Sequence, residues 1–549
     1  MNTLREFVEY KLTHSDKTAE ANGYPLKMEN CKKYKKMKQL MLYGNTVQDG
    51  TPTPDNPIEV QSVGEKSVNL LEDARDIYNG NGAEDSLVAT HYTETIEDGR
   101  ECVKFQNTPN IIYRKIKFKE NTQYTFSFDC KCVKQGGYTS YPPYDIPLRI
   151  HYTNGNIKAI TIANDGIWRR LTFTSAENST IDYIGGISFD YRDYMYIDIN
   201  SFQIQEGTTA TPYEPYGKYK IPVVQRGINY FSMAKTTATD QTINGITFTP
   251  LDDERVQVKG TATADAYYYL YAKNAKNMVL KAGTYKSKPF NELGITILFG
   301  CKYLDGTGAG NINSLHSSAT FNSDTYIANA LVYVTKGTIV DNIVEIQLMK
   351  GTENSPYEPY VEPVTTNIFL NEPLRKIGDY ADYIDGKNKK VVRNVYKAII
   401  SKSNLSWSLG VSAWQREGHT DFLGMSVEPI ISQGYKGYSN RFIAGNWTWS
   451  GNTFPCNYFL IGVYKNKYIH FIINNDYLDG ITDESTDAEK IAAFKKFLAE
   501  NETYVIYPLQ TPIEEPITCE LPKLTAKTTI IEVDTSLFPT NAYGKYIKK

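Results

Sequence analysis

Residues 203–219 read QIQEGTTATPYEPYGKY, and residues 347–363 read QLMKGTENSPYEPYVEP. Of the fourteen positions that begin at Gln203 and at Gln347, eight are identical. Each copy begins at the end of a segment in which apolar and polar residues alternate. A glycine turn follows, and then the sequence Pro-Tyr-Glu-Pro-Tyr. Two nearby prolines fix φ and favour an extended backbone. The repeat therefore predicts a segment that closes one β module and spaces it from the next, with its tyrosines packed against their own module.

The starts of the modules also repeat. Asn69-Leu-Leu, Asn229-Tyr-Phe and Asn367-Ile-Phe each precede a new stretch rich in strand-forming residues. A start, a body and an exit that recur in order indicate an array of similar units. We expect a helical attachment segment at 1–20, a small β element with a Pro/Gly-rich connector at 21–64, module one at 65–222, module two at 223–363, and a C-terminal β-rich module at 364–549.

Alternation at a period of two dominates the chain. From Tyr124 to Cys132, apolar side chains alternate with polar ones, which is typical of a half-buried antiparallel strand. Many such segments, cut by Gly, Asn and Pro and without intervening helices, favour β-sandwiches over α/β units. The chain has 43 tyrosines, and we expect most of them to fill sandwich cores. The prediction is an all-β fold of tandem sandwich modules.

Two short segments carry helical signals. Thr3 and Glu6 form a capping box before a helix from Thr3 to about Lys11. Thr486 and Glu489 form a second capping box, followed by an apolar stripe over residues 487–500. We therefore expect one short helix at the N-terminus and one near the C-terminus.

Composition argues against several kinds of partner. The net charge of −3 does not favour nucleic acid or an anionic membrane surface. No apolar run approaches the roughly 20 residues that cross a bilayer, so no membrane insertion is expected. The first residues include acidic ones and lack an apolar stretch, so no secretory signal is expected either.

Signals for catalysis and for metal binding are weak. The seven cysteines include no C-x-x-C pair, the six histidines are scattered singly, and no nucleophile or phosphate-loop motif occurs. The acidic run 252–254 predicts an exposed turn. Asp379, Asp382 and Asp385 predict exposed surface, with a calcium site as the alternative. We expect a protein without catalysis, metal or cofactor.

Tryptophan is concentrated near the C-terminus, where four of five lie within 43 residues. Parallel aromatic rings beside polar side chains are typical of saccharide sites. The alternative is that these rings form the core of the last domain. The candidate carbohydrate-binding residues are Trp407, Trp414, Tyr435, Tyr438, Trp447 and Trp449.

Several stretches resemble a known class of proteins. Residues 42–64, LYGNTVQDGTPTPDNPIEVQSVG, resemble a segment of tail- and baseplate-associated proteins in phages of Gram-positive (Firmicutes) bacteria. Residues 368–385, 504–516 and 529–534 look like their downstream module. Residues 118–128 and 165–174 are similar to strands of carbohydrate-binding-module-like jelly rolls.

The resemblance implies tandem jelly-roll modules in a virion protein of the tail tip, baseplate or fibre. Such a protein attaches to host-surface glycan, contacts other virion proteins and forms a homo-oligomer, with a trimer expected. It is assembled in the bacterial cytoplasm, released by lysis and located in the virion. Two alternatives stay open: a purely architectural or decoration protein of tail or capsid, and a polysaccharide depolymerase.

Overall fold

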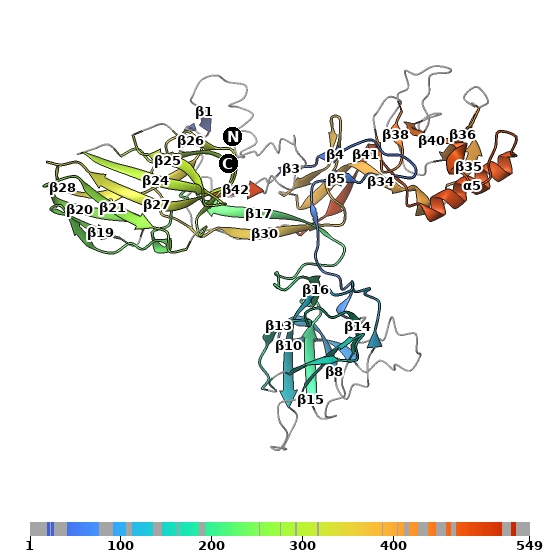
Figure 1. Ribbon diagram of the computed structural model, residues 1–549, viewed down its shortest axis with the longest axis horizontal. Coiled ribbons are helices and arrows are strands. Elements are labelled where there is room, and N and C mark those ends of the chain that lie inside the picture. Colours follow the sequence, from blue (N-terminus) through green and yellow to red (C-terminus); the bar gives the residue numbers. More distant parts are fainter. Residues whose placement is uncertain are drawn as a thin grey trace. The chain divides into compact units, whose positions relative to one another are not determined.

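In the computed structural model, the chain folds into two compact units (Figure 1). One unit contains residues 1–62, 222–368 and 374–549, and the other contains residues 63–221 and 369–373. The helix expected at the N-terminus lies outside the described residues. The structure describes residues 19–21, 24–26, 41–75, 92–105, 112–134, 145–161, 163, 165–185, 193–251, 253–274, 276–290, 294–315, 318–386, 388–402, 405–410, 417–425, 437–445, 457–462, 468–518 and 529–533.

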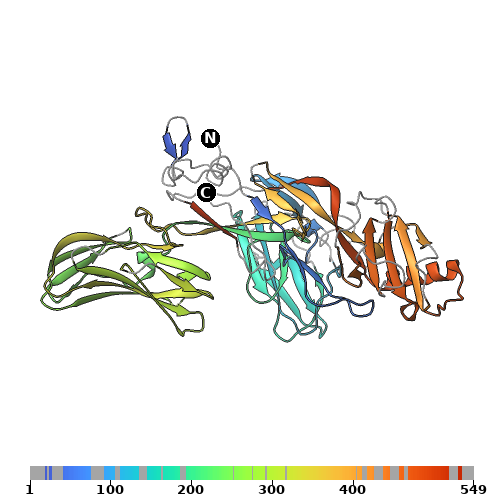
Figure 2. The same cartoon turned by 90° about the horizontal axis from the view of Figure 1, so that it is seen from above.

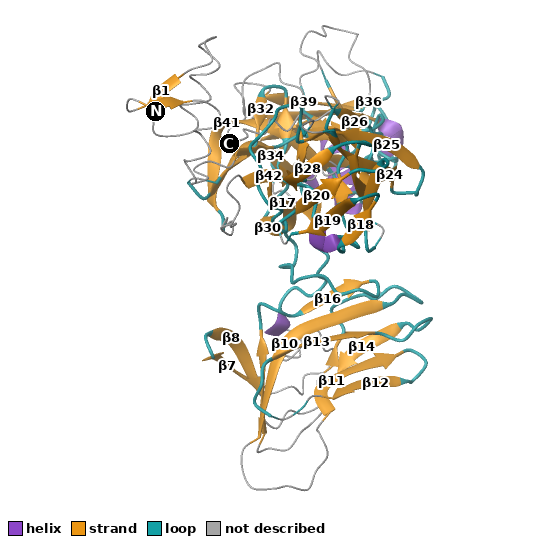
Figure 3. Cartoon of the chain, turned by 90° about the vertical axis from the view of Figure 1, so that its left-hand side faces the viewer, coloured by secondary structure: helices purple, strands orange, loops and turns teal. Residues whose placement is uncertain are grey.

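Module one, in the smaller unit, is a sandwich of two antiparallel sheets (Figure 3). Sheet A runs in the order β13 (Arg169–Thr174), β10 (Tyr124–Lys134), β15 (Asp193–Asp198), β8 (Arg100–Phe105) and β7 (Tyr92–Glu97), and β16 (Gln203–Glu206) also pairs with β10. Sheet B runs in the order β12 (Ile157–Thr161), β11 (Asp145–Tyr152), β14 (Ile181–Gly185) and β9 (Ile112–Tyr113).

The core of module one follows the predicted alternation. Phe126, Phe128 and Cys130 of β10 are fully buried and pack with Ile150 and Ile184 of sheet B. Burial raises the pKa of the Cys130 thiol to about 12, as expected of a cysteine that acts as a small apolar filler. The all-β fold is confirmed.

Module two is a second sandwich, whose strands lie in two layers (Figure 2). Its first sheet has β18 (Gln241–Ile243), β19 (Ile246–Pro250), β20 (Arg255–Thr261) and β28 (Ile339–Glu345) in order, and β26 (Ala319–Phe321), β23 (Gly283–Ser287) and β29 (Leu348–Lys350) form a short sheet. Its sheet B has β21 (Ala266–Tyr271), β27 (Thr325–Val334), β24 (Ile295–Tyr303) and β25 (Gly308–Asn313), with β22 (Val279–Leu280) beside β27.

The two modules share their strand pairing. The order β9-β14-β11-β12 in module one corresponds to β21-β27-β24-β25 in module two. Likewise, β10 lies between β13 and β16 as β23 lies between β26 and β29. The repeated sequence therefore corresponds to a repeated sandwich, and sheet B is the equivalent sheet in both copies.

A buried asparagine joins the start of module one to its last strand. The Asn69 carboxamide oxygen accepts hydrogen bonds from the backbone N–H groups of Leu71 and Ile204, both at 3.1 Å. Its amide nitrogen donates to the carbonyl of Phe202 at 3.2 Å. These three hydrogen bonds serve backbone groups that would otherwise be unpaired in the core.

Module two repeats this arrangement at Asn229. Its oxygen accepts from the N–H groups of Phe231 and Leu348 at 3.1 Å, and its nitrogen donates to the carbonyl of Ile346 at 3.1 Å. We call Asn69 and Asn229 the closing asparagines. Asn367, the third expected module start, differs: it lies partly exposed inside β30 (Val364–Leu370), and none of its described contacts is a comparable side-chain bond.

The Pro-Tyr-Glu-Pro-Tyr motif is anchored through its glutamate. In module one the N–H of Glu214 donates to the Gln203 side-chain oxygen at 2.7 Å. The Glu214 carboxylate accepts from the N–H of Val68 at 2.9 Å and pairs with Lys220 at 2.8 Å. Tyr216 is 45 % exposed, so its expected packing against the module is wrong.

The second copy of the motif is anchored in the same way. The N–H of Glu358 donates to the Gln347 side-chain oxygen at 2.7 Å, and Glu358 is buried. The Tyr360 N–H donates to the carboxylate of Glu254 at 2.7 Å. Burial raises the pKa of Glu254, which also accepts from the N–H of Met233. The expectation that residues 252–254 form an exposed turn is therefore wrong for Glu254.

The connectors between modules form a small sheet of their own. Its central strand, β17 (Tyr219–Gly227), lies between β30 and β42 (Thr529–Val533), and β6 (Glu65–Lys66) also pairs with β17. β42 pairs with β17 over Val223–Gly227.

The C-terminal part contains two five-stranded sheets. One has β3 (Met41–Tyr43), β33 (Tyr383–Asp385), β34 (Lys390–Ile399), β41 (Tyr504–Pro516) and β37 (Tyr438–Ser439) in order. The other has β35 (Trp407–Leu409), β36 (His419–Met425), β40 (Tyr468–Asn474), β39 (Tyr458–Gly462) and β38 (Ile443–Ala444), packed against helix α5 (Asp487–Glu500). α5 has the predicted bounds and the predicted capping box of Thr486 and Glu489.

Residues 41–62 fold with this C-terminal part, although the sequence suggested a separate small element over 21–64. β3 pairs with β33, and the hairpin β4 (Thr46–Gln48) and β5 (Val60–Ser62) follows it. The N–H of Val60 donates to the Tyr504 hydroxyl at 3.0 Å.

Asp382 is the most deeply buried acidic residue of this sheet region. It is fully buried, and its carboxylate accepts from the N–H groups of Arg375, Asn394 and Val395 at 2.8–3.0 Å. Asp385 is buried as well. The expectation of exposed surface is therefore wrong for both, because their partners lie on neighbouring strands and turns.

Asn229→Ala tests the closing asparagine. The change leaves two N–H groups and one carbonyl without partners in the core of module two. We expect the free energy of opening at β29 to fall by roughly 2–4 kcal/mol, measured by hydrogen exchange of the full chain. Asn367→Ala is the matched control and should change protection by less than about 0.5 kcal/mol. Equal effects of the two changes would contradict the assignment.

Glu254→Gln tests the buried carboxylate. Because burial raises the folded-state pKa, ionisation of Glu254 opposes folding. The stability that protonated Glu254 contributes is lost as pH rises from the usual glutamate pKa, about 4.3, through the folded-state pKa. We expect the stability of module two, followed by hydrogen exchange, to fall less over this window in Glu254→Gln than in the original chain. Parallel pH profiles would contradict the prediction.

Candidate functional site

Two of the six predicted sugar-binding residues are described, and both pack against cores. Trp407 is partly buried, with its ring edge-to-face with Phe494 at 5.0 Å and over Gly424, where a Cβ would meet it at 2.7 Å. Tyr438 packs against a buried cluster that includes Val395 and Ile506. These placements fit the alternative that the rings form the domain core. Trp414, Tyr435, Trp447 and Trp449 lie outside the described residues.

Module two instead exposes a row of tyrosines on sheet B. Tyr267, Tyr269 and Tyr271 of β21 are 46 %, 39 % and 51 % exposed, whereas Tyr268 and Leu270 between them are fully buried. Alternate residues of a strand point to opposite faces. The buried set fills the sandwich core, so the exposed set covers the outer face.

The exposed rings are stacked in pairs. Tyr267 lies against Tyr333 of β27, with ring centroids 4.9 Å apart and planes at 27°. Tyr269 and Tyr271 stack with centroids 5.3 Å apart and planes at 10°. We call these four residues the tyrosine face. Stacking on paired strands holds the rings in place before any ligand arrives, which lowers the entropy lost on binding.

The tyrosine face continues across sheet B into aliphatic and amide side chains. Asn329 lies beside Gly300, where a Cβ would meet the Asn329 amide at 2.9 Å, so the glycine makes room for that amide. Aliphatic surface and amides next to aromatic rings offer contact with apolar ring faces and hydrogen bonds to hydroxyls. The strand register aligns Tyr269 with Leu331, Leu298 and Asn313 in one row, and Tyr271 with Asn329, Gly300 and Asn311 in the next.

The hydroxyls of this face can donate and accept hydrogen bonds. Partial burial and then the nearby Asp265 raise the pKa of Tyr267. Such a surface suits a hydroxyl-rich ligand.

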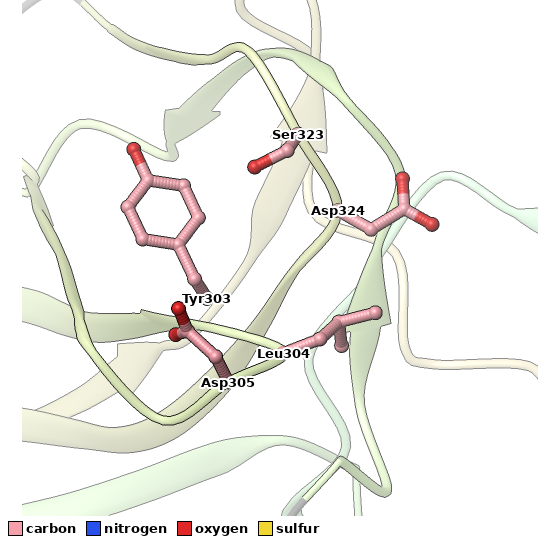
Figure 4. Close-up of a pocket in the computed structure, with 5 residues that line it drawn as sticks. All are labelled: Tyr303, Leu304, Asp305, Ser323 and Asp324. Carbon is pink, nitrogen blue, oxygen red and sulfur yellow. The ribbon is translucent and has the colours of Figure 1, made fainter.

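An open pocket lies at the end of sheet B, at the turns that follow β24 and β26. The Asp324 carboxylate, which points away from Tyr303, pairs with Lys281 at 3.0 Å. The Thr307 hydroxyl holds the pKa of Asp305 below its usual range. Asp305 therefore serves its own turn, and Asp324 holds the turn that contains Lys281 and Ala282. The pocket is lined by Tyr303, Leu304, Asp305, Ser323 and Asp324 (Figure 4).

Within the described ranges, no group of three or more His, Cys, Asp or Glu residues is placed to hold a metal ion. No helix in that part of the chain is both long enough and apolar enough to span a membrane.

The sequence analysis missed the tyrosine face. Its signal is Ala266–Tyr271, AYYYLY, in which tyrosine occupies both faces of the strand. A run that is aromatic on both faces does not show which face is buried.

Comparison with known proteins finds few similarities. No protein-family model matches the chain, and no curated protein matches it. Among solved structures, the chain is similar to the N-terminal CBM22-1-CBM22-2 tandem domain from Paenibacillus barcinonensis Xyn10C. The identity is 12 %, the TM-score is 0.24, and the match covers 52 % of this chain and 99 % of that one.

Proposed function

We propose that the protein is a non-catalytic attachment protein that binds host-surface glycan through the tyrosine face of module two. The observation that carries the proposal is the set of exposed, pairwise stacked rings on strands β21 and β27 of sheet B. The sandwich core does not use these rings. Large aromatic side chains left on an outer face mark a binding surface.

The chemistry of the face favours a saccharide. The apolar C–H side of a sugar ring packs on a tyrosine ring, and the rows of Asn329 and Asn311 offer donors and acceptors to its hydroxyls. A flat ladder of rings along a strand fits an extended chain of sugar units rather than one small molecule.

The virion part of the proposal rests on sequence resemblance. Residues 42–64 and 504–516 resemble segments of phage tail and baseplate proteins. We place the protein at the tail tip, baseplate or fibre, as a homo-oligomer that contacts other virion proteins. Host glycan is then its outward partner.

Two other functions make different predictions. An architectural or decoration protein would bind no glycan. A polysaccharide depolymerase would release reducing ends from host polysaccharide, and it needs a pair of carboxylates placed across a bound sugar. In the described pocket, Asp305 is engaged by Thr307 of its own turn, and Asp324 is engaged by Lys281 and Ala282 of another turn.

The double change Tyr269→Ala with Tyr271→Ala tests the site. Loss of two rings should weaken binding by about 10- to 100-fold, because the stacking surface is removed while the core is untouched. Affinity electrophoresis of the full chain in gels that contain wall or capsular polysaccharide from Firmicutes measures the change. Tyr216→Ala is the matched control, since Tyr216 is 45 % exposed in module one and should have no effect.

Three outcomes would contradict this assignment. Unchanged binding in the Tyr269/Tyr271 variant, with loss in Trp447→Ala/Trp449→Ala, would move the site to the C-terminal module. Absence of any polysaccharide binding by the original chain would favour the architectural role. Release of reducing ends would favour the depolymerase.

A further inference from the structure

Sheet B of module one has the same strand order as its equivalent in module two but a different outer face. Ile150 of β11 and Ile184 of β14 are fully buried, so their neighbours Arg149, His151 and Tyr183 lie on the outer side. Arg114 follows β9 at the edge of the same sheet. Where module two carries four tyrosines, module one carries two arginines around one tyrosine and one histidine.

The four side chains form an ordered group, which we call the arginine face. The rings of His151 and Tyr183 stack with centroids 4.1 Å apart and planes at 12°. The Arg114 guanidinium lies 5.0 Å from the Tyr183 ring centroid and forms an exposed pair with Asp182 at 3.7 Å. Contact with the ring restrains Arg114 beside the stack.

Arg149 supplies the second cation. The strand register places it between Gly185 of β14 and Ala159 of β12, so small residues flank the guanidinium. Its Nε is buried and forms no hydrogen bond within the described structure. Arg149 as a whole is partly exposed, so an anionic group on a ligand can reach the side chain. Burial, and then Arg149, hold the pKa of His151 below its usual range.

Cations on sheet A of the same module are engaged differently. Lys131 pairs with Glu97 and Asp98 at 2.6 and 2.8 Å. Arg100 pairs with Asp129 and Asp198 at 2.9 and 3.2 Å. Their charge is neutralised by neighbours. On the arginine face, by contrast, Asp182 is the one acidic residue that forms an ion pair with either guanidinium group within the described part of the chain.

We propose that the arginine face of module one binds the carboxylates of an acidic polysaccharide built from uronic acids. The inference rests on the proposed function, because the tyrosine face requires a ligand made of sugar rings. A guanidinium fork matches a carboxylate through two parallel hydrogen bonds. A polyol phosphate has anionic charge but no sugar ring in its backbone to stack on the tyrosine face. A uronic acid polymer satisfies both faces.

The test is affinity electrophoresis of the full chain in gels that contain polygalacturonate. We expect retardation that weakens as salt is added and falls about tenfold in Arg149→Met, as expected for loss of a charged hydrogen bond. Arg114→Met, on an exposed side chain, provides a second variant whose folding is not at risk. Lys104→Met on sheet A removes the same charge and should leave retardation unchanged.

Several results would overturn the inference. These are equal weakening by Lys104→Met, no retardation by polygalacturonate, and retardation by poly(glycerol phosphate) alone. If polygalacturonate is not bound while wall polysaccharide is still bound through Tyr269 and Tyr271, only this inference fails. If neither polymer is bound, the proposed function fails with it.

Discussion

The repeated architecture depends on the hydrogen bonds that a buried asparagine forms at the start of each sandwich module. Asn69 and Asn229 each connect the start of a module to the last strand of the same module, more than a hundred residues away in the sequence. Each side chain is buried and forms three hydrogen bonds to backbone groups. Because such groups cost free energy when unpaired, the side chain fixes where the module begins and where its last strand lies.

The repeated motif completes this closure. A glutamine beside the module exit accepts the N–H of the motif glutamate at the same distance in both modules. It is Gln203, the first residue of β16, in module one and Gln347, directly before β29, in module two. The chain thus leaves each module at a fixed point. Both modules close in the same way and have equivalent core strands, so the outer face of sheet B can differ between them. It carries tyrosines in module two and arginines in module one.

Sequence patterns predicted much of this fold. The capping box of Thr486 and Glu489 marked helix α5 because it is a local signal that needs no distant partner. The alternation from Tyr124 to Cys132 likewise matched strand β10. The module repeat was visible because its closing residues, Asn, Gln and Glu, recur in order.

The failures share a physical cause. Glu254 and Asp382 look like surface acids in the sequence, but each is buried and accepts backbone N–H groups. The donor to Glu254 is Tyr360 from a distant segment, and those to Asp382 come from the neighbouring turn and strand. Asn367 has the sequence of a module start without the distant strand that would use it. The tyrosine face was missed because strand β21 is aromatic on both sides. Tertiary contacts decide whether an acidic side chain is buried and which face of a strand points into the core. The periodicity of the sequence alone does not reveal these contacts.

The central claim is that glycan binds on sheet B of module two. Hydrogen exchange of the full chain, with and without oligosaccharides released from host wall polysaccharide, tests it most directly. The account predicts added protection in peptides that cover β21 and β27. Protection confined to residues 405–462, or no protection anywhere despite measured binding, would contradict it.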